Sequence, residues 1–339
     1  MPPELIPPDV SVLMAVYNAE VYVESAVRSV LNQTYRNFEL VILNDGSADG
    51  SLAILESLAL EDTRIRLSSQ TNKGLVRTAN AMIALAKGRY LSLMDHDDEM
   101  LPACLAEEVA HLELHPECVA VGVLSCYIDG SGKVTRQRTN FAGLLAGYSR
   151  RIPSLTAFPP RTPFIGNPAS MVRSDAMRQV GGYREAFAYA NDIDLWFRLA
   201  ENGEVHRLNK MLLRYRRHGT NATFRHRGAI VMYDVVSHLS AWARHYRLND
   251  EGLIDNFRGP DNFLSTVEAY KRLIGVRYPT ETFIYYRALG SRLPEIAGAS
   301  SRVEMQQLAF AHIKGALNQP GKLQLLRRAL AQAFSRRKG

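Results

Sequence analysis

The feature that most constrains the fold is a regular alternation of strand and helix signals over the first hundred residues. Residues 10–17 and 38–43 form near-continuous apolar runs, as expected for strands that are covered on both faces. Residues 65–67 and 90–94 are two shorter strand candidates. Between these strands, apolar residues recur at helical spacing over 23–31, 52–58 and 75–86. This order predicts an α/β fold with a doubly wound, mostly parallel sheet flanked by helices.

Polar residues follow three of the predicted strands. Tyr17 and Asn18 follow the first strand, residues 44–47 (Asn-Asp-Gly-Ser) follow the second, and residues 95–98 (Asp-His-Asp-Asp) follow the fourth. In doubly wound sheets, ligands bind in the crevice beyond the carboxyl ends of the strands. The sequence therefore predicts a ligand site at this edge of the sheet.

The strongest chemical signal is the acidic run at residues 95–99, which holds four carboxylates in five positions. Such carboxylates repel one another unless a positive charge offsets them. Hard oxygen ligands of this kind favour Mg²⁺ or Mn²⁺, shared with the phosphates of a substrate. A solvated acidic turn before the helix near Pro102 is the simpler interpretation. The position at the end of a strand favours the metal site.

Three further residues have both a structural and a functional interpretation. Asp45 suits an ordinary Asx turn, and equally a carboxylate that accepts a hydrogen bond from a base or ribose. Asp192 opens a predicted helix over 192–200, where it serves as a helix N-cap, as a general base at a cleft, or as both. His218 follows a basic run and becomes a metal-ligand candidate only if the fold returns it to the acidic run.

The rest of the chain falls into two parts. The pattern predicts a helix over 102–115, a strand over 119–124, a loop over 130–168, a helix over 174–180, and mainly helices after residue 229. Residues 225–339 carry 18 Lys/Arg against 9 Asp/Glu, whereas residues 1–224 carry 23 against 25. We therefore predict two parts, an N-terminal α/β domain over 1–224 and a basic α-helical C-terminal region over 225–339.

Composition narrows the class of protein. Three cysteines without a CxxC pair argue against a disulfide framework and for a reducing compartment. No apolar run approaches the roughly 20 residues that span a bilayer. Residues 1–9 contain no basic segment of the kind that begins a secretory signal, so we expect a cytoplasmic protein.

Taken together, these motifs resemble the family 2 glycosyltransferases, which are inverting enzymes of the GT-A fold. The resemblance covers about residues 9–224. It rests on segments in the family's order, namely 10–18, 29–35, 38–47, 72–75 with Asn80, 88–90, 95–98, 166–167, 180–183, 191–198 and 215–218. One departure is that this chain has Asn191 before Asp192, where the family usually has glutamate.

The resemblance implies roles for nine residues. It implies a nucleotide-sugar donor in the N-terminal half, with Asp192 as the catalytic base and Asp97 and His218 as ligands of Mn²⁺ or Mg²⁺. Asp95 is implied to reach the ribose or the water shell of the metal. The remaining donor-binding residues implied in this way are Ala15, Tyr17, Asp45, Asn72 and Asn80.

The function expected from this resemblance is transfer of a sugar, from a donor that we expect to be UDP-linked, to a hydroxyl of a carbohydrate or lipid-linked acceptor. No nucleic-acid partner is expected. Two alternatives remain, a sugar-phosphate nucleotidyltransferase and a non-catalytic nucleotide-sugar or glycan-binding relative. The first should carry a Gly-rich basic loop after the first strand, where this chain has Ala-Val-Tyr-Asn-Ala-Glu at 15–20.

The end of the chain carries a separate prediction. Leu323, Leu326, Leu330 and Phe334 share one helical face, and six basic residues lie between 322 and 338. Such a helix either docks on its own protein or lies on an anionic membrane surface. The second possibility would place the protein at the inner face of the membrane.

Overall fold

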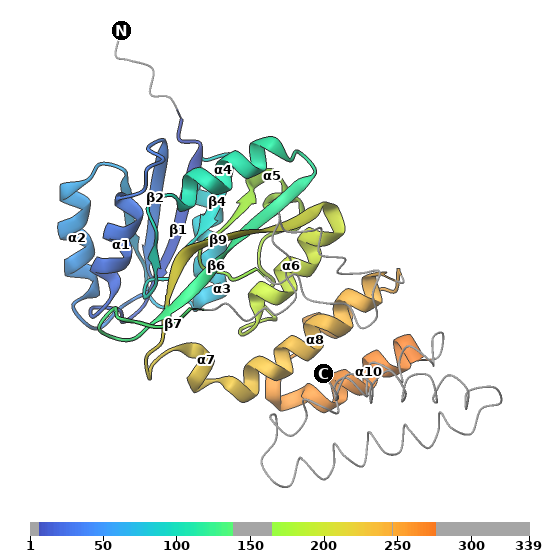
Figure 1. Ribbon diagram of the computed structural model, residues 1–339. Helices are drawn as coiled ribbons and strands as arrows, with labels where there is room; N and C mark the ends of the chain where they lie inside the picture. Colours follow the sequence, from blue (N-terminus) through green and yellow to red (C-terminus); the bar gives the residue numbers. More distant parts are fainter. Residues whose placement is uncertain (1–6, 138–164, 246, 276–339) are drawn as a thin grey trace, which may run out of the picture. The chain divides into compact units, whose positions relative to one another are not determined.

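The computed structural model describes residues 7–137, 165–245 and 247–275 (Figure 1). The chain divides into two compact units, and among the described residues the second begins at Arg227. The three cysteines are free and buried. Within the described residues, no helix is both long enough and apolar enough to cross a membrane.

The first unit is built on the predicted parallel sheet. Its first four strands are β1 (Val10–Val16), β2 (Phe38–Asn44), β3 (Ile65–Ser69) and β4 (Tyr90–Leu93). They pair in parallel in the order β3-β2-β1-β4. Every residue of β2 is buried, because helices cover both faces of the sheet. The predicted strand–helix alternation is confirmed over this part of the chain.

The other strands depart from the prediction. The sheet continues from β4 through β8 (Ser170–Arg173), β6 (Cys118–Ile128), β9 (Glu204–Arg216) and β5 (Glu99–Met100), and β7 (Val134–Gln137) pairs with β6. β8 runs antiparallel to both of its neighbours, so the sheet is mixed. The prediction of a loop over 130–168 was wrong at β7, and β8 and β9 were not predicted. Their short or interrupted apolar runs carry no strong period, and pairing with β6 is what makes them strands.

Helices cover both faces of this sheet (Figure 1). α1 (Val23–Leu31), α2 (Ser51–Glu61) and α4 (Cys104–Leu114) contribute buried residues to one apolar core cluster. α3 (Leu75–Leu85), α5 (Ser174–Gln179) and α6 (Asn191–Asn202) contribute to a second one. Alternate residues of β1 divide between the clusters, with Val12 and Met14 in the first and Leu13 in the second. This is the doubly wound arrangement that the sequence predicts.

The described part of the second unit is helical. It comprises α8 (Arg227–His245), α9 (Glu251–Asp255), a 3₁₀ turn (Gly259–Asn262) and α10 (Phe263–Gly275), whereas α7 (Ala222–Arg225) belongs to the first unit. A hydrogen bond from Tyr270 Oη to Asp250 Oδ2 (2.5 Å) ties α10 to the start of α9. The helices predicted after residue 275, including the one that carries Leu323 to Phe334, lie outside the described residues.

Candidate active site

A cavity of about 750 Å³ opens beyond the carboxyl ends of β1, β2 and β4. Seven of the nine residues that the resemblance singles out line it: Ala15, Tyr17, Asp45, Asn72, Asp95, Asp97 and His218. They come from five separate stretches of sequence. Asn80 and Asp192 are not among the lining residues. The parallel sheet therefore gathers most of the predicted site in one place.

The acidic run divides into groups with different environments. Carboxylate oxygens of Asp95, Asp97 and Asp98 all lie within 4.8 Å of one another. Asp98 is 1% exposed, and its Oδ1 accepts a hydrogen bond from the backbone N–H of Arg216 (2.7 Å). Burial, together with the charges of Asp97 and Asp95, raises the pKa of Asp98 well above its ordinary value. Asp98 thus joins the end of β4 to the end of β9 and leaves Asp97 to face the cavity.

Asp97 is held in a small polar cluster with His218. The Oδ2 atom of Asp97 lies 2.9 Å from His218 Nε2 and accepts a hydrogen bond from Asn221 Nδ2 (3.0 Å). The other ring nitrogen of His218 lies 2.6 Å from Thr220 Oγ1, and the ring is 4.7 Å from that of Tyr22. His218 is thereby returned to the acidic run, which is the condition that the sequence left open.

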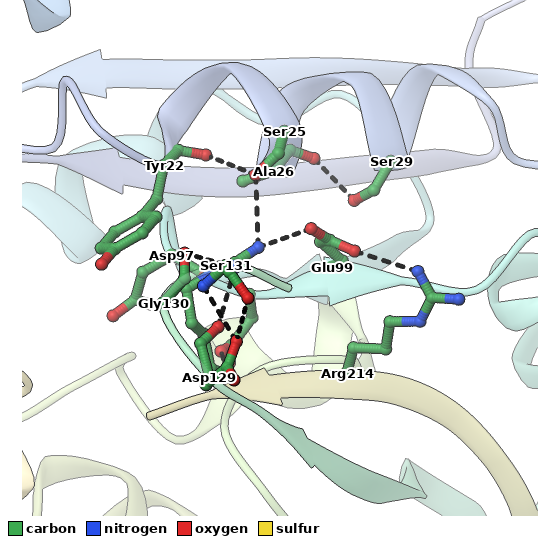
Figure 2. A network of polar contacts seen from close by, with 12 residues as sticks. Tyr22, Ser25, Ala26, Ser29, Asp97, Glu99, Asp129, Gly130, Ser131 and Arg214 are labelled. Atoms are coloured by element: carbon green, nitrogen blue, oxygen red, sulfur yellow. Dashed lines mark hydrogen bonds and ion pairs between the residues drawn. The ribbon is translucent and has the colours of Figure 1, made fainter. Parts of the chain in front are cut away.

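Arg216 is a buried cation that holds in place the loop carrying the acidic run, residues 95–99 (the acidic loop). It is 3% exposed, and its Nε donates to the carbonyl oxygen of Asp97 (2.8 Å). Its guanidinium also pairs with Glu99 and lies 4.9 Å from the ring centre of Tyr22. Figure 2 shows Glu99 facing Arg214 on one side (3.2 Å), with the Asp129–Ser131 turn nearby. The basic run at 214–217 therefore includes a structural anchor that motif reasoning did not identify.

Asp95 is oriented by two successive hydrogen bonds that link it to Asn167 and Tyr183. The amide of Asn167 bonds to Asp95, and Asn167 Oδ1 accepts from the hydroxyl of Tyr183 (3.0 Å). Burial, with the charges of Asp97 and Asp192, raises the pKa of Asp95 to about 7. These hydrogen bonds hold Asp95 close to Asp97, where burial and the neighbouring negative charges make its carboxyl group hard to ionise.

The donor contact expected for Asn80 does not match this geometry. Its Nδ2 donates to the carbonyl of Tyr183 (2.8 Å), and its Oδ1 accepts from the N–H of Tyr183 (2.9 Å). Both ends of the amide are thus used to hold Tyr183, which itself lines the cavity. Asn80 is better described as a residue that positions the cavity wall.

Asp45 organises the loop that follows β3. Its Oδ1 accepts from Gln70 Nε2 (2.8 Å) and from the N–H of Lys73 (2.9 Å), and its Oδ2 accepts from the N–H of Gly74 (2.9 Å). Burial opposes ionisation, but these hydrogen bonds prevail and lower the pKa of Asp45. Asp45 is therefore an ionised acceptor at the cavity, and it also places Asn72 beside it.

Asp192 lies at the second position of α6, and the N-cap is Ala190 in a left-handed conformation (φ 50°). The N-cap role considered for Asp192 was therefore wrong. Its charge raises the pKa of both Asp95 and Tyr183, so its carboxylate is close to the cavity. The helix is fixed by the next carboxylate, because buried Asp194 pairs with Arg184 and Arg198. Asp192 thus lies in the first turn of a helix that these two ion pairs hold in place.

The sequence profile described as glycosyl transferase family 2 matches residues 11–181. The chain belongs to this family. The putative glycosyltransferase EpsE of Bacillus subtilis (strain 168) is 34% identical over 200 residues, which are 58% of this chain and 68% of EpsE. The hyaluronan synthase of Pasteurella multocida is 29% identical over 225 residues, 65% of this chain but only 22% of the synthase.

Solved structures show the same GT-A fold at low sequence identity. Staphylococcus aureus TarS 1–349 in complex with UDP-GlcNAc superposes with a TM-score of 0.56 at 18% identity, over 85% of this chain and 81% of TarS. The mannosyltransferase PcManGT from Pyrobaculum calidifontis, in complex with GDP-Man and Mn²⁺, superposes with a TM-score of 0.53 at 18% identity, over 93% of this chain and 82% of PcManGT. The protein is therefore a family 2 glycosyltransferase, which does not support the sugar-phosphate nucleotidyltransferase alternative.

Proposed function

We propose that this glycosyltransferase carries out inverting, cation-assisted transfer of a sugar from a UDP-linked donor to a saccharide hydroxyl. The observation that carries the proposal is the position of Asp97, at the end of a parallel strand and bonded to His218 and Asn221 inside the cavity. Three carboxylates and an imidazole at the carboxyl edge form a site for a cation and a diphosphate.

The residues present fit a hard divalent cation. Asp98 Oδ2 is buried and, within the described part of the chain, has no hydrogen-bond partner, so the acidic loop contains a polar oxygen that a nearby cation would stabilise. Asp97 and His218 would hold the cation, with Asp95 beside them. When bound, a cation of this class neutralises a diphosphate leaving group. Mn²⁺ in the structural neighbour PcManGT supports this class of ion.

The donor is proposed to lie along the ends of β1 and β2. Tyr17 is 48% exposed at the cavity and offers a ring face for a base, whereas Asp45 is an ionised acceptor. The cavity volume is within the range of sites that bind molecules of nucleotide size. UDP and UDP-GlcNAc complexes of TarS support a uridine donor.

Asp192 is the proposed general base. Its carboxylate takes the proton of the acceptor hydroxyl, and the oxygen attacks the anomeric carbon on the face opposite the diphosphate. The bond from that carbon to the phosphate oxygen breaks, and its electron pair leaves with the nucleoside diphosphate. Configuration inverts, so an α-linked donor gives a β-linked product. No covalent bond to the protein is formed.

The acceptor is proposed to be a growing saccharide, free or lipid-linked. Hyaluronan synthase and chondroitin synthase of Pasteurella multocida are among the relatives, and both names describe polymers of sugars. This chain spans about a fifth of those enzymes. Acting on a lipid-linked saccharide would suit a cytoplasmic protein at the inner face of the membrane.

The test is a panel of UDP- and GDP-sugars incubated with the protein and Mn²⁺ or Mg²⁺, with release of nucleoside diphosphate as the readout. One or more UDP-sugars should turn over only with the cation. Asp97→Asn should remove cation-dependent UDP binding in calorimetry. Glu185→Gln is the matched control, because this exposed carboxylate pairs with exposed Arg77 at the surface. Equal UDP affinity with and without cation in the unmodified protein would refute the assignment.

A further inference from the structure

A second cluster of metal-ligating side chains lies at the opposite end of the sheet from the active site. His206 is near the start of β9, whereas Arg216 at its end anchors the acidic loop. The ten intervening steps correspond to about 30 Å of strand. Cys118 begins the neighbouring strand β6, and His111 lies on α4, which packs on that strand.

The cluster combines nitrogen and sulfur atoms in a buried place. His111, Cys118 and His206 are 6%, 0% and 5% exposed, and one ligand atom from each lies within 4.8 Å of the others. His111 Nε2 is 2.8 Å from His206 Nδ1. In a tetrahedral zinc site the bonds are about 2.0–2.3 Å, so neighbouring ligand atoms stand about 3.3–3.7 Å apart. A shift of about half an ångström between the imidazoles would admit the ion.

The residues around the three proposed ligands could orient them and give an ion access from solvent. Glu204 Oε2 lies 2.9 Å from His206 Nε2, the nitrogen that faces away from His111. A carboxylate on the far nitrogen of a ligating histidine fixes the tautomer and makes the imidazole a better ligand. The ring centre of His115 lies 4.4 Å from that of His111, with the two rings tilted, and His115 Nδ1 lies 3.1 Å from Glu117 Oε1. These two residues are partly exposed and provide a route from solvent.

The surrounding backbone holds the cluster in register. Arg173 donates from Nε to the carbonyl of Cys118 (2.8 Å) and from Nη2 to that of Leu112 (2.6 Å). It therefore joins the end of α4 to the start of β6. The N–H of Glu204 donates to the carbonyl of Glu117 (2.9 Å), which joins β9 to the same turn.

We propose that His111, Cys118 and His206 form a structural zinc site, separate from the catalytic cation site. The two sites differ in ligand type. Nitrogen and sulfur ligands suit Zn²⁺, whereas the oxygen-rich acidic loop suits Mg²⁺ or Mn²⁺. Binding of Zn²⁺ displaces the thiol proton of Cys118 to solvent, and a water molecule or His115 completes four-coordination. The ion would then fasten α4, β6 and β9 together.

In the absence of metal, burial leaves both the His111 imidazole and the Cys118 thiol uncharged. Burial, with His115 and His206 nearby, lowers the pKa of His111 to about 4, so its imidazole is neutral and able to ligate. Burial raises the pKa of the Cys118 thiol to about 12. Metal affinity should therefore increase with pH, because a proton has to leave Cys118.

The test uses the full chain, stripped with a chelator and titrated with ZnCl₂ while excess Mg²⁺ occupies the oxygen site. One equivalent of Zn²⁺ should bind and raise the melting temperature. Glu204→Gln should weaken zinc binding by about 10–100-fold, as for other groups that orient a ligand. His206→Gln should weaken it further. His238→Gln on α8 is the control and should leave zinc affinity unchanged.

A second readout identifies the sulfur. Co²⁺ in place of Zn²⁺ should give a thiolate-to-cobalt absorption band that is absent in Cys118→Ser and present in Cys126→Ser, a buried cysteine of the same strand. If Cys118→Ser does not fold, zinc protection of Cys118 from alkylation in the unmodified chain replaces it. Failure to bind Zn²⁺, a band independent of Cys118, or unchanged alkylation would each overturn the proposal.

Discussion

Glu108 is a buried carboxyl group that has no ionic partner among the described residues. It lies on α4 with 0% exposure, among the apolar residues of the first core cluster. Within the described residues, its Oε2 accepts a single long hydrogen bond from Cys104 Sγ (3.7 Å), and its Oε1 has no hydrogen-bond partner. Burial raises the pKa of Glu108 from 4.5 to about 8. At neutral pH the folded chain therefore keeps this proton.

This burial makes stability depend on pH in a defined direction. Below pH 4.5 the carboxyl is protonated in both the folded and the unfolded chain, so it contributes no pH dependence. Above that pH the unfolded chain releases the proton and the folded chain does not, which favours unfolding by about 1.4 kcal/mol per pH unit. The penalty is about 3 kcal/mol at pH 7 and levels off above about pH 8, where the folded carboxyl ionises.

Glu108→Gln removes the titration and keeps the shape of the side chain. We expect it to match the original chain near pH 4.5 and to be more stable by about 3 kcal/mol at pH 7. Urea unfolding of both chains at several pH values between 4.5 and 8 measures the difference. The other titrating groups are common to both chains, so their contributions cancel.

The adjacent Glu107 gives a matched control. Its carboxylate pairs with Lys210 at the surface (2.5 Å, Lys210 54% exposed), so Glu107→Gln should change stability by less than about 1 kcal/mol. That change should show no comparable trend with pH. If the gap between Glu108→Gln and the original chain stays constant from pH 4.5 to 8, the carboxyl is not protonated in the folded state and the reasoning fails.

Four further predictions concern the active site and the end of the chain. Asp192→Asn should keep UDP affinity in calorimetry and lower turnover by about 10²–10⁴-fold, and transfer at the original rate would exclude it as the base. Asn191→Glu, which restores the usual family residue, should leave the melting temperature nearly unchanged, and a lost fold would reveal a packing role. Asn80→Ala removes both hydrogen bonds to the Tyr183 backbone and should destabilise the first unit by about 1–3 kcal/mol in urea unfolding, and an unchanged midpoint would count against its positioning role. Truncation after Pro320 should abolish salt-sensitive sedimentation with anionic liposomes if residues 322–338 bind membrane, whereas a lower melting temperature without sedimentation would mean that they dock on the protein.

The order of elements in the first half follows directly from the sequence. Residues 10–17 and 38–43 have no polar face, and a strand of that kind is stable only when helices cover both sides. This local requirement was enough to predict the parallel strands β1 to β4 and the edge at which Tyr17, Asp45 and Asp95 gather. Short-range patterns of hydrophobicity carry such information because the period of each element is local.

Tertiary structure decided the rest, because it depends on contacts between distant residues. Pairing with β6 made a strand of residues 204–216, and that strand carries Arg216 and His218 back to the acidic loop. Asn80 looked like a donor contact by motif, and only the fold shows both ends of its amide on Tyr183. Asn221 had no local signal at all. Its role arises from a 3.0 Å hydrogen bond to Asp97, which lies 124 positions away in the sequence. A local sequence pattern cannot encode a contact between residues so far apart.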